Sequence, residues 1–245
     1  MGADAVQRRA WVAGATGYTG RAIVRALRDA GIETVAHIRP DSPDLGSWTE
    51  RFAAVGAQTS SCPWRPDALR DALQQARPTL VFALLGTTAA RAKRLAASGQ
   101  DASAETYEAV DYGLTRMLLD AALTLEPLPR LVYLSSLGAQ SPGPVAYLRV
   151  RHRMETELLA SGIPARIARP AGITGPDRSE DRPAERISAA LTDAGLGALA
   201  AIGLGGVRAR YGSMDAATLA RGLLRCALDA DDGPVVVEAA ALRAP

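Results

Sequence analysis

The chain has almost no cysteine and almost no histidine. Cys62 and Cys226 are its only cysteines in 245 residues, and its two histidines, His37 and His152, are also far apart. Neither pair has metal-ligand spacing, so the sequence predicts no metal site and no disulfide framework. This cysteine usage favours a reducing compartment, and we expect a cytoplasmic protein.

The chain also lacks a strong charge excess and a long hydrophobic run. Its formal net charge is +2 and its arginines are scattered, so we expect no nucleic-acid partner and no membrane partner. The uncharged run Ala194–Val207 is glycine-rich and too short to span a bilayer. We expect a globular protein that acts on a small-molecule substrate, either as a monomer or as a homodimer.

Short apolar segments alternate with amphipathic segments along the chain. This alternation predicts an α/β fold, a Rossmann-type doubly wound parallel sheet with helices on both faces. We expect one domain over residues 1–245, in which residues 172–213 form a small C-terminal substrate lid. The expected strands are 10–13, 34–38, 57–61, 80–85, 130–134, 165–168 and 235–238, and the expected helices include 49–55, 66–76, 104–125, 147–160 and 184–194.

A glycine-rich segment separates the first expected strand from the first expected helix. Glycine lets the backbone turn tightly and approach a pyrophosphate, whose charge then lies at the free N–H groups of the helix N-terminus. We therefore predict that this segment binds a dinucleotide. The predicted cofactor-binding residues here are Gly14, Thr16, Gly17, Tyr18, Thr19 and Gly20.

The end of the second expected strand lacks an acidic residue and carries Arg39 instead. Enzymes that bind NAD usually place a carboxylate there to hold the ribose hydroxyls, whereas a guanidinium can pair with the 2′-phosphate of NADP. Arg39 therefore favours NADP(H) over NAD(H). A solvated arginine at a strand end is the alternative.

A second small turn follows the apolar strand 80–85. Its residues Leu85, Gly86, Thr87 and Thr88 would let the backbone lie against the adenosine and pyrophosphate of the cofactor, with the hydroxyls donating to phosphate oxygens. The alternative is a plain turn in which threonine caps the next helix.

With these motifs the chain resembles the short-chain dehydrogenase/reductase superfamily, in its extended or atypical branch of NAD(P)H-binding and NAD-dependent epimerase-like proteins. The resemblance covers nearly the whole chain. It rests on segments 14–20, 85–88, 110–111, 133–136, 169–173 and 213–216.

The resemblance implies a catalytic tyrosine, serine and lysine. It makes Tyr147 the acid/base and Ser136 the residue that orients the substrate, with Ser135 as the fallback. The backbone beyond Arg169 would lie beside the nicotinamide, which gives three further cofactor-binding residues: Pro170, Ala171 and Ile173.

The lysine of the family pattern, four residues after the tyrosine, is absent. Arg151 stands in its place and keeps the positive charge that could support the tyrosine and reach the ribose. Unlike lysine, arginine cannot release a proton near neutral pH. Asp111 likewise stands where the family often has asparagine.

These observations predict an NADP(H)-dependent oxidoreductase acting on a small carbonyl or alcohol. Because Arg151 replaces the lysine, the alternative is a non-catalytic NADPH-binding regulator or redox sensor. A sugar-nucleotide epimerase or dehydratase is the third possibility.

Overall fold

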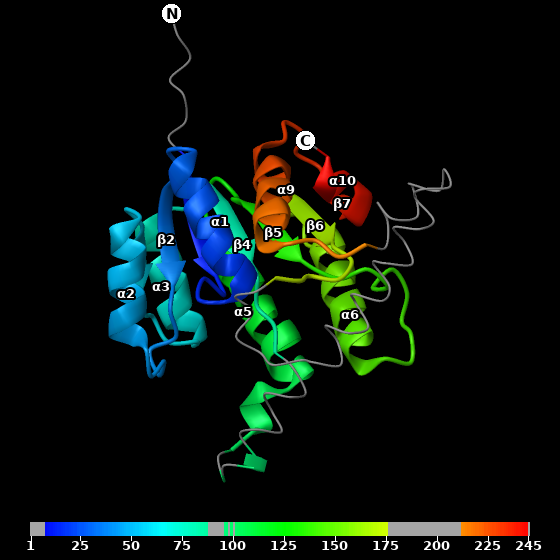
Figure 1. Ribbon diagram of the computed structural model, residues 1–245, viewed down its shortest axis with the longest axis horizontal. Helices are drawn as coiled ribbons and strands as arrows, with labels where there is room; N and C mark the ends of the chain where they lie inside the picture. The colour runs from blue at the N-terminus through cyan, green and yellow to red at the C-terminus, as the bar shows by residue number, and fades with distance from the viewer. Residues whose placement is uncertain (1–7, 88–95, 98, 100, 176–211, 245) are drawn as a thin grey trace, which may run out of the picture.

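The computed structural model describes residues 8–87, 96, 97, 99, 101–175 and 212–244 (Figure 1). Seven parallel strands form one sheet in the order β3-β2-β1-β4-β5-β6-β7, which confirms the predicted Rossmann-type fold. The strands are β1 (Arg9–Ala13), β2 (Glu33–His37), β3 (Gln58–Ser60), β4 (Leu80–Ala83), β5 (Arg130–Leu134), β6 (Ala165–Arg169) and β7 (Val235–Glu238).

Helices cover both faces of the sheet. They are α1 (Tyr18–Asp29), α2 (Leu45–Ala54), α3 (Pro66–Ala76), the 3₁₀ turn η1 (Ser103–Glu105), the π-helix η2 (Tyr107–Leu114), α5 (Thr115–Ala122), α6 (Ala146–Ala160), α9 (Ala216–Leu228) and α10 (Ala239–Arg243). Because successive strand residues face opposite sides, β1 directs Val12 into the core shared with α1 and α9, and Trp11 into the core shared with α3, α5 and α6. Both faces are thus buried, as the continuously apolar strands require.

Two predicted helices differ from the structure. Helix α2 begins at Leu45, four residues before the predicted start, because Leu45 and Trp48 pack against the core. The predicted helix 104–125 is instead three elements. Its break lies at Thr106, which has an extended backbone and whose hydroxyl accepts a hydrogen bond from the Ala109 N–H.

The predicted helix 184–194, the run Ala194–Val207 and most of the predicted lid lie outside the described residues. The two ends of that segment are described, and they lie side by side. Ile173 and Met214 form a parallel bridge, and the Tyr18 hydroxyl donates to the Thr174 carbonyl at 3.0 Å. Within the described ranges, no helix combines the length and apolarity needed to cross a membrane, and no group of His, Cys, Asp or Glu could hold a metal ion.

His37 ends β2 inside an aromatic cluster. Its ring stacks on Trp11, meets Trp64 edge-on, and places Nε2 2.8 Å from the Cys62 carbonyl oxygen. Burial lowers the pKa of His37 below its ordinary value, although the hydrogen bond to Cys62 opposes this shift. The folded protein therefore holds His37 neutral at a pH where the unfolded chain takes up a proton.

We expect this difference to make stability depend on pH. Stability should be fully present above the ordinary histidine pKa of 6.5 and should fall as the pH drops from there through the lowered pKa of His37. In His37→Gln the free energy of unfolding, measured by urea titration, should decline less over that range. An identical decline in both proteins would contradict this account.

Candidate active site

The glycine turn after β1 is built so that only glycine fits. Gly14 has a φ of +82°, and a Cβ added there would lie 2.6 Å from the Leu84 carbonyl oxygen. A Cβ on Gly20 would lie 2.1 Å from the Gly14 carbonyl oxygen. The turn closes through a 3.1 Å hydrogen bond from the Gly17 N–H to that same oxygen, so the chain passes directly from β1 into α1.

The N-terminus of α1 suits a phosphate group. Gly17 is its N-cap and supplies no side-chain cap, and the first turn carries no acidic residue. The first N–H groups of the helix, with the positive end of its dipole, are therefore not matched by an anionic side chain. Thr16 and Tyr18 are half-buried beside the turn, whereas Thr19 is buried. The residues present thus fit a dinucleotide pyrophosphate.

Two carboxylates accept hydrogen bonds from the turn after β4. The Thr87 N–H donates to Asp111 Oδ2 at 2.9 Å, and the Thr87 hydroxyl donates to Glu105 Oε2 at 3.2 Å. The expectation that the Thr87 hydroxyl donates to a phosphate therefore competes with an internal bond. Thr88 lies outside the described residues.

Arg151 is almost completely buried, with 4% of its surface exposed. Its Nη2 donates to Asp111 Oδ1 at 2.6 Å and to the Leu85 carbonyl at 3.0 Å. Its Nη1 donates to the Leu134 carbonyl at 2.6 Å and to the Tyr133 hydroxyl at 3.2 Å. One guanidinium thus joins the exits of β4 and β5 to the π-helix η2.

Gly86 makes room for this guanidinium. A Cβ on Gly86 would lie 2.9 Å from Arg151 Nη2 and 3.4 Å from Asp111 Oδ1. Burial raises the pKa of the Asp111 carboxyl, although Arg151 and the Thr87 N–H both favour its ionised form. Burial also raises the pKa of the Tyr133 phenol to about 12, so Tyr133 stays protonated near neutral pH.

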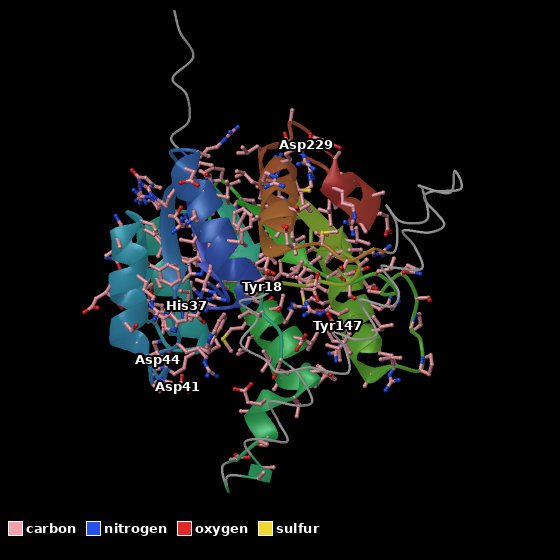
Figure 2. All side chains as sticks on the ribbon, viewed as in Figure 1. Tyr18, His37, Asp41, Asp44, Tyr147 and Asp229 are labelled. Atoms are coloured by element: carbon pink, nitrogen blue, oxygen red, sulfur yellow. The ribbon has the colours of Figure 1, made fainter. Side chains whose placement is uncertain are left out.

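Tyr147 lies in the first turn of α6, at the same end of the sheet as Tyr18 (Figure 2). Its half-buried ring packs edge-on against Tyr107, with 5.3 Å between ring centroids. The Arg151 guanidinium carbon is 5.1 Å from the Tyr147 ring centroid. The predicted acid/base therefore has a fixed cation beside it.

The two candidate serines have different surroundings. The buried Ser135 hydroxyl donates to Glu155, which also accepts hydrogen bonds from Arg169. The half-buried Ser136 hydroxyl has a weaker local bond, to the Leu137 carbonyl at 3.2 Å. Ser135 thus belongs to a buried polar network, whereas Ser136 is half-buried and bonds within its own loop.

The segment after β6 completes this end of the sheet. Pro170 is buried, and its carbonyl accepts a 2.8 Å hydrogen bond from the Leu137 N–H, so it is tied to the serine loop. Ala171 and Ile173 are half-buried and pack on the α1 side of the core.

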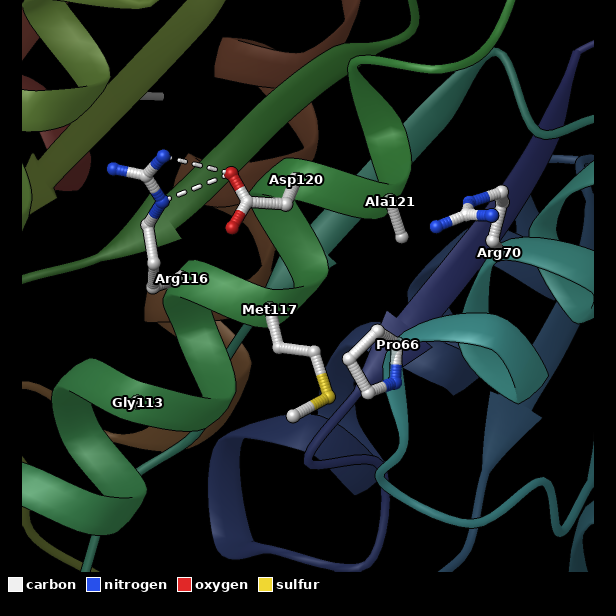
Figure 3. A pocket seen from close by; sticks show the side chains of 7 residues that line it. All are labelled: Pro66, Arg70, Gly113, Arg116, Met117, Asp120 and Ala121. Atoms are coloured by element: carbon white, nitrogen blue, oxygen red, sulfur yellow. Dashed lines mark hydrogen bonds and ion pairs between the residues drawn. The ribbon is translucent and has the colours of Figure 1, made fainter.

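A cavity of about 240 Å³ lies elsewhere, between α3 and α5 (Figure 3). None of its lining residues belongs to the glycine turn, the strand exits or α6, so we do not include it in the site. The lining residues are Pro66, Arg70, Gly113, Arg116, Met117, Asp120 and Ala121.

Comparison with known proteins agrees with this geometry. A model of the NAD(P)H-binding family matches residues 14–195, from the glycine turn past the end of β6. The chain belongs to this NAD(P)H-binding family. It is also similar to the mitochondrial protein FMP52 of Candida albicans, with 23% identity over 167 residues, which is 67% of each chain.

Solved structures share the fold of this chain. A short-chain dehydrogenase/reductase family oxidoreductase from Burkholderia thailandensis has a TM-score of 0.64 and 15% identity, over 98% of this chain and 94% of that one. UDP-glucose 4-epimerase from Brucella ovis, in complex with NAD, has a TM-score of 0.62 and 16% identity, over 94% and 76%. At this level of identity, these matches show a shared fold.

The structure also shows how this NAD(P)H-binding protein engages Arg39. Arg39 Nη1 donates to Glu105 Oε1 at 2.9 Å, and its Nε lies 3.7 Å from Asp41 Oδ1. Arg39 is therefore part of a charge cluster, and 39% of its side chain is exposed. Sequence reasoning missed Glu105 and Glu155, because each meets its partners only through the folding of distant segments.

The pair Arg151–Asp111 should be strongly coupled. Arg151→Met leaves a carboxylate buried without its cation, which we expect to cost about 3–5 kcal/mol of stability. Asp111→Asn added to Arg151→Met should recover part of that loss. The free energy of unfolding in urea measures both effects.

Arg153→Met is the matched control on the same helix. Arg153 pairs with Glu108 at the surface, so we expect its loss to cost less than about 1 kcal/mol. If the effects of Arg151→Met and Asp111→Asn on the free energy of unfolding simply added, the coupling would be refuted.

Proposed function

We propose that this protein is an NADP(H)-dependent oxidoreductase that acts on a small carbonyl or alcohol. The observation that carries the proposal is the half-buried Tyr147 phenol beside the buried Arg151 cation, at the sheet end where the glycine turn would hold the cofactor. In this proposal, bound NADP(H) supplies or accepts the hydride.

In this proposal, residues of this chain bind the cofactor, transfer the proton and orient the substrate. The glycine turn and the N-terminus of α1 bind the pyrophosphate, and Arg39 pairs with the 2′-phosphate. The Tyr147 hydroxyl gives a proton to the substrate oxygen during reduction and removes it during oxidation. The Ser136 hydroxyl donates a hydrogen bond to that oxygen and orients it. Ala171 and Ile173 line the nicotinamide end.

In this proposal Arg151 acts as a fixed charge and not as a ribose ligand. Its two Nη groups already donate to Asp111, Tyr133 and two strand-end carbonyls. Its guanidinium carbon lies 5.1 Å from the Tyr147 ring centroid, so a positive charge is held beside the phenol. Proton release from this position is not needed, since Tyr147 can exchange its proton with solvent.

A second candidate function rests on the same arginine. The Asp111 carboxylate offsets the positive charge of Arg151. The Nη groups of Arg151 donate to internal acceptors, so the contact that the family lysine makes with the ribose has no counterpart in this proposal. Both features suit a regulator that binds NADPH without turnover. The two candidates differ in whether any carbonyl substrate consumes NADPH.

Tyr147→Phe separates the candidates. With a panel of aldehydes and ketones, we expect the wild type to oxidise NADPH and the variant to lose at least about 100-fold in kcat, because the acid/base proton is gone. NADPH binding, measured by titration calorimetry, should stay within about twofold.

Tyr112→Phe is the matched control, since the Tyr112 hydroxyl bonds Glu157 on the flank of α6. We expect it to keep wild-type turnover. Wild-type binding without turnover on any carbonyl would favour the regulator, and full activity in Tyr147→Phe would refute the acid/base assignment.

The role of Arg39 has its own test. Arg39→Glu should weaken NADPH binding by roughly 10- to 100-fold relative to NADH, because a carboxylate repels the 2′-phosphate that the guanidinium attracts. The dissociation constants of both nucleotides measure this ratio. Arg25→Glu, at an exposed position on α1, should leave it unchanged. An unaltered ratio in Arg39→Glu would remove the NADP(H) assignment.

A further inference from the structure

Glu105 is a buried carboxylate at the carboxyl end of the sheet. Only 9% of its surface is exposed. One carboxylate oxygen accepts from Arg39 Nη1 at 2.9 Å, and the other accepts from the Thr87 hydroxyl at 3.2 Å. Arg39 lies two residues beyond β2 and Thr87 four residues beyond β4, so Glu105 connects the exits of these two strands.

The strand order makes this connection significant. β1 lies between β2 and β4 in the sheet, so the link Arg39–Glu105–Thr87 spans the end of β1. The glycine turn leaves β1 at this end. A dinucleotide whose pyrophosphate lies on the N-terminus of α1, and whose adenosine reaches Arg39, must therefore run beside the Glu105 carboxylate.

The charges at this place oppose a 2′-phosphate. Arg39 already donates to one carboxylate, and Asp41 adds a second acidic group 3.7 Å from its Nε. A 2′-phosphate would have to share or displace the Glu105 contact, and it would be repelled by the carboxylate itself. A ribose 2′-hydroxyl meets no such penalty and can donate a hydrogen bond to a carboxylate.

We propose that Glu105 determines the nucleotide preference of this protein. By competing with the 2′-phosphate for Arg39, it lowers the advantage of NADP(H) and admits NAD(H) to the same site. Sequence reasoning sought a carboxylate at the end of the second strand, and the fold supplies one from 66 residues further along the chain. This inference rests on the proposed function only in giving Arg39 the 2′-phosphate.

The test uses two probes that differ by one group, 2′,5′-ADP and 5′-ADP. Neither contains a nicotinamide, so the result does not depend on Tyr147 or on turnover. Binding is measured by titration calorimetry at one fixed ionic strength, because the contacts are partly exposed and are screened by salt. The proteins are the wild type, Glu105→Gln, Arg39→Gln and the control Glu108→Gln.

Glu105→Gln removes the charge but keeps an oxygen that can accept from Arg39 or Thr87. We expect it to bind 2′,5′-ADP about tenfold more tightly than the wild type does, and 5′-ADP within about twofold. Glu108→Gln removes the same charge from an exposed position three residues away, and should change neither affinity by more than about twofold. Melting temperatures confirm that each variant is folded.

Three results would overturn the inference. Glu105→Gln could leave the ratio of the two affinities unchanged, or it could change that ratio no more than Glu108→Gln does. Third, Arg39→Gln could leave 2′,5′-ADP binding unaltered, which would remove the competition itself. Failure of the wild type to bind either probe would instead refute nucleotide binding, and with it the proposed function.

Discussion

The carboxyl end of this sheet depends on one buried guanidinium. Arg151 reaches from α6 to the backbone exits of β4 and β5 and to the Asp111 carboxylate. Burying such a group is costly unless its donors are paired, and here both Nη groups donate to internal acceptors, four in all, whereas the buried Nε has no partner among the described residues. The missing side chain at Gly86 and the inward position of Asp111 on the π-helix η2 both serve this arrangement. The position of the Tyr147 ring depends on the same guanidinium, because Tyr147 lies one helical turn before Arg151 on α6 and its ring packs beside that group.

The proposed site therefore has two halves that differ in how far their charged groups are buried. At the proposed reaction half, Arg151 and Asp111 are buried, so Tyr147 would act beside a guanidinium held by internal hydrogen bonds. At the adenosine half, Arg39 and Asp41 are partly exposed, and only Glu105 is buried. Preference among nucleotides can change there through single charges, while the geometry around Tyr147 stays the same.

Much of the fold could be predicted from the sequence, because it depends on local patterns. The helix Pro66–Ala76 and the strands Arg130–Leu134 and Val235–Glu238 have the predicted bounds. The glycine turn was also predictable, since the close approaches at Gly14 and Gly20 admit no other residue. These features need only a few neighbouring residues to specify them.

What could not be predicted joins distant segments. The contacts of Glu105 with Arg39 and of Asp111 with Arg151 span 66 and 40 residues, and no periodicity encodes them. The sequence predicts an ordinary helix over η2, because local propensity does not specify a π-helix. Arg151 itself was identified, but its engagement by four internal acceptors was not.

The most direct test of this account is a crystal structure with NADP⁺ bound. We predict that the Tyr147 hydroxyl lies within about 3–5 Å of the nicotinamide C4, the range of a reactive approach with a substrate oxygen between them. Arg151 should still donate to Asp111 and to the Leu85 carbonyl, without touching the ribose. A phenol far from the ring, or an Arg151 side chain released from Asp111 and bound to the ribose, would contradict the account.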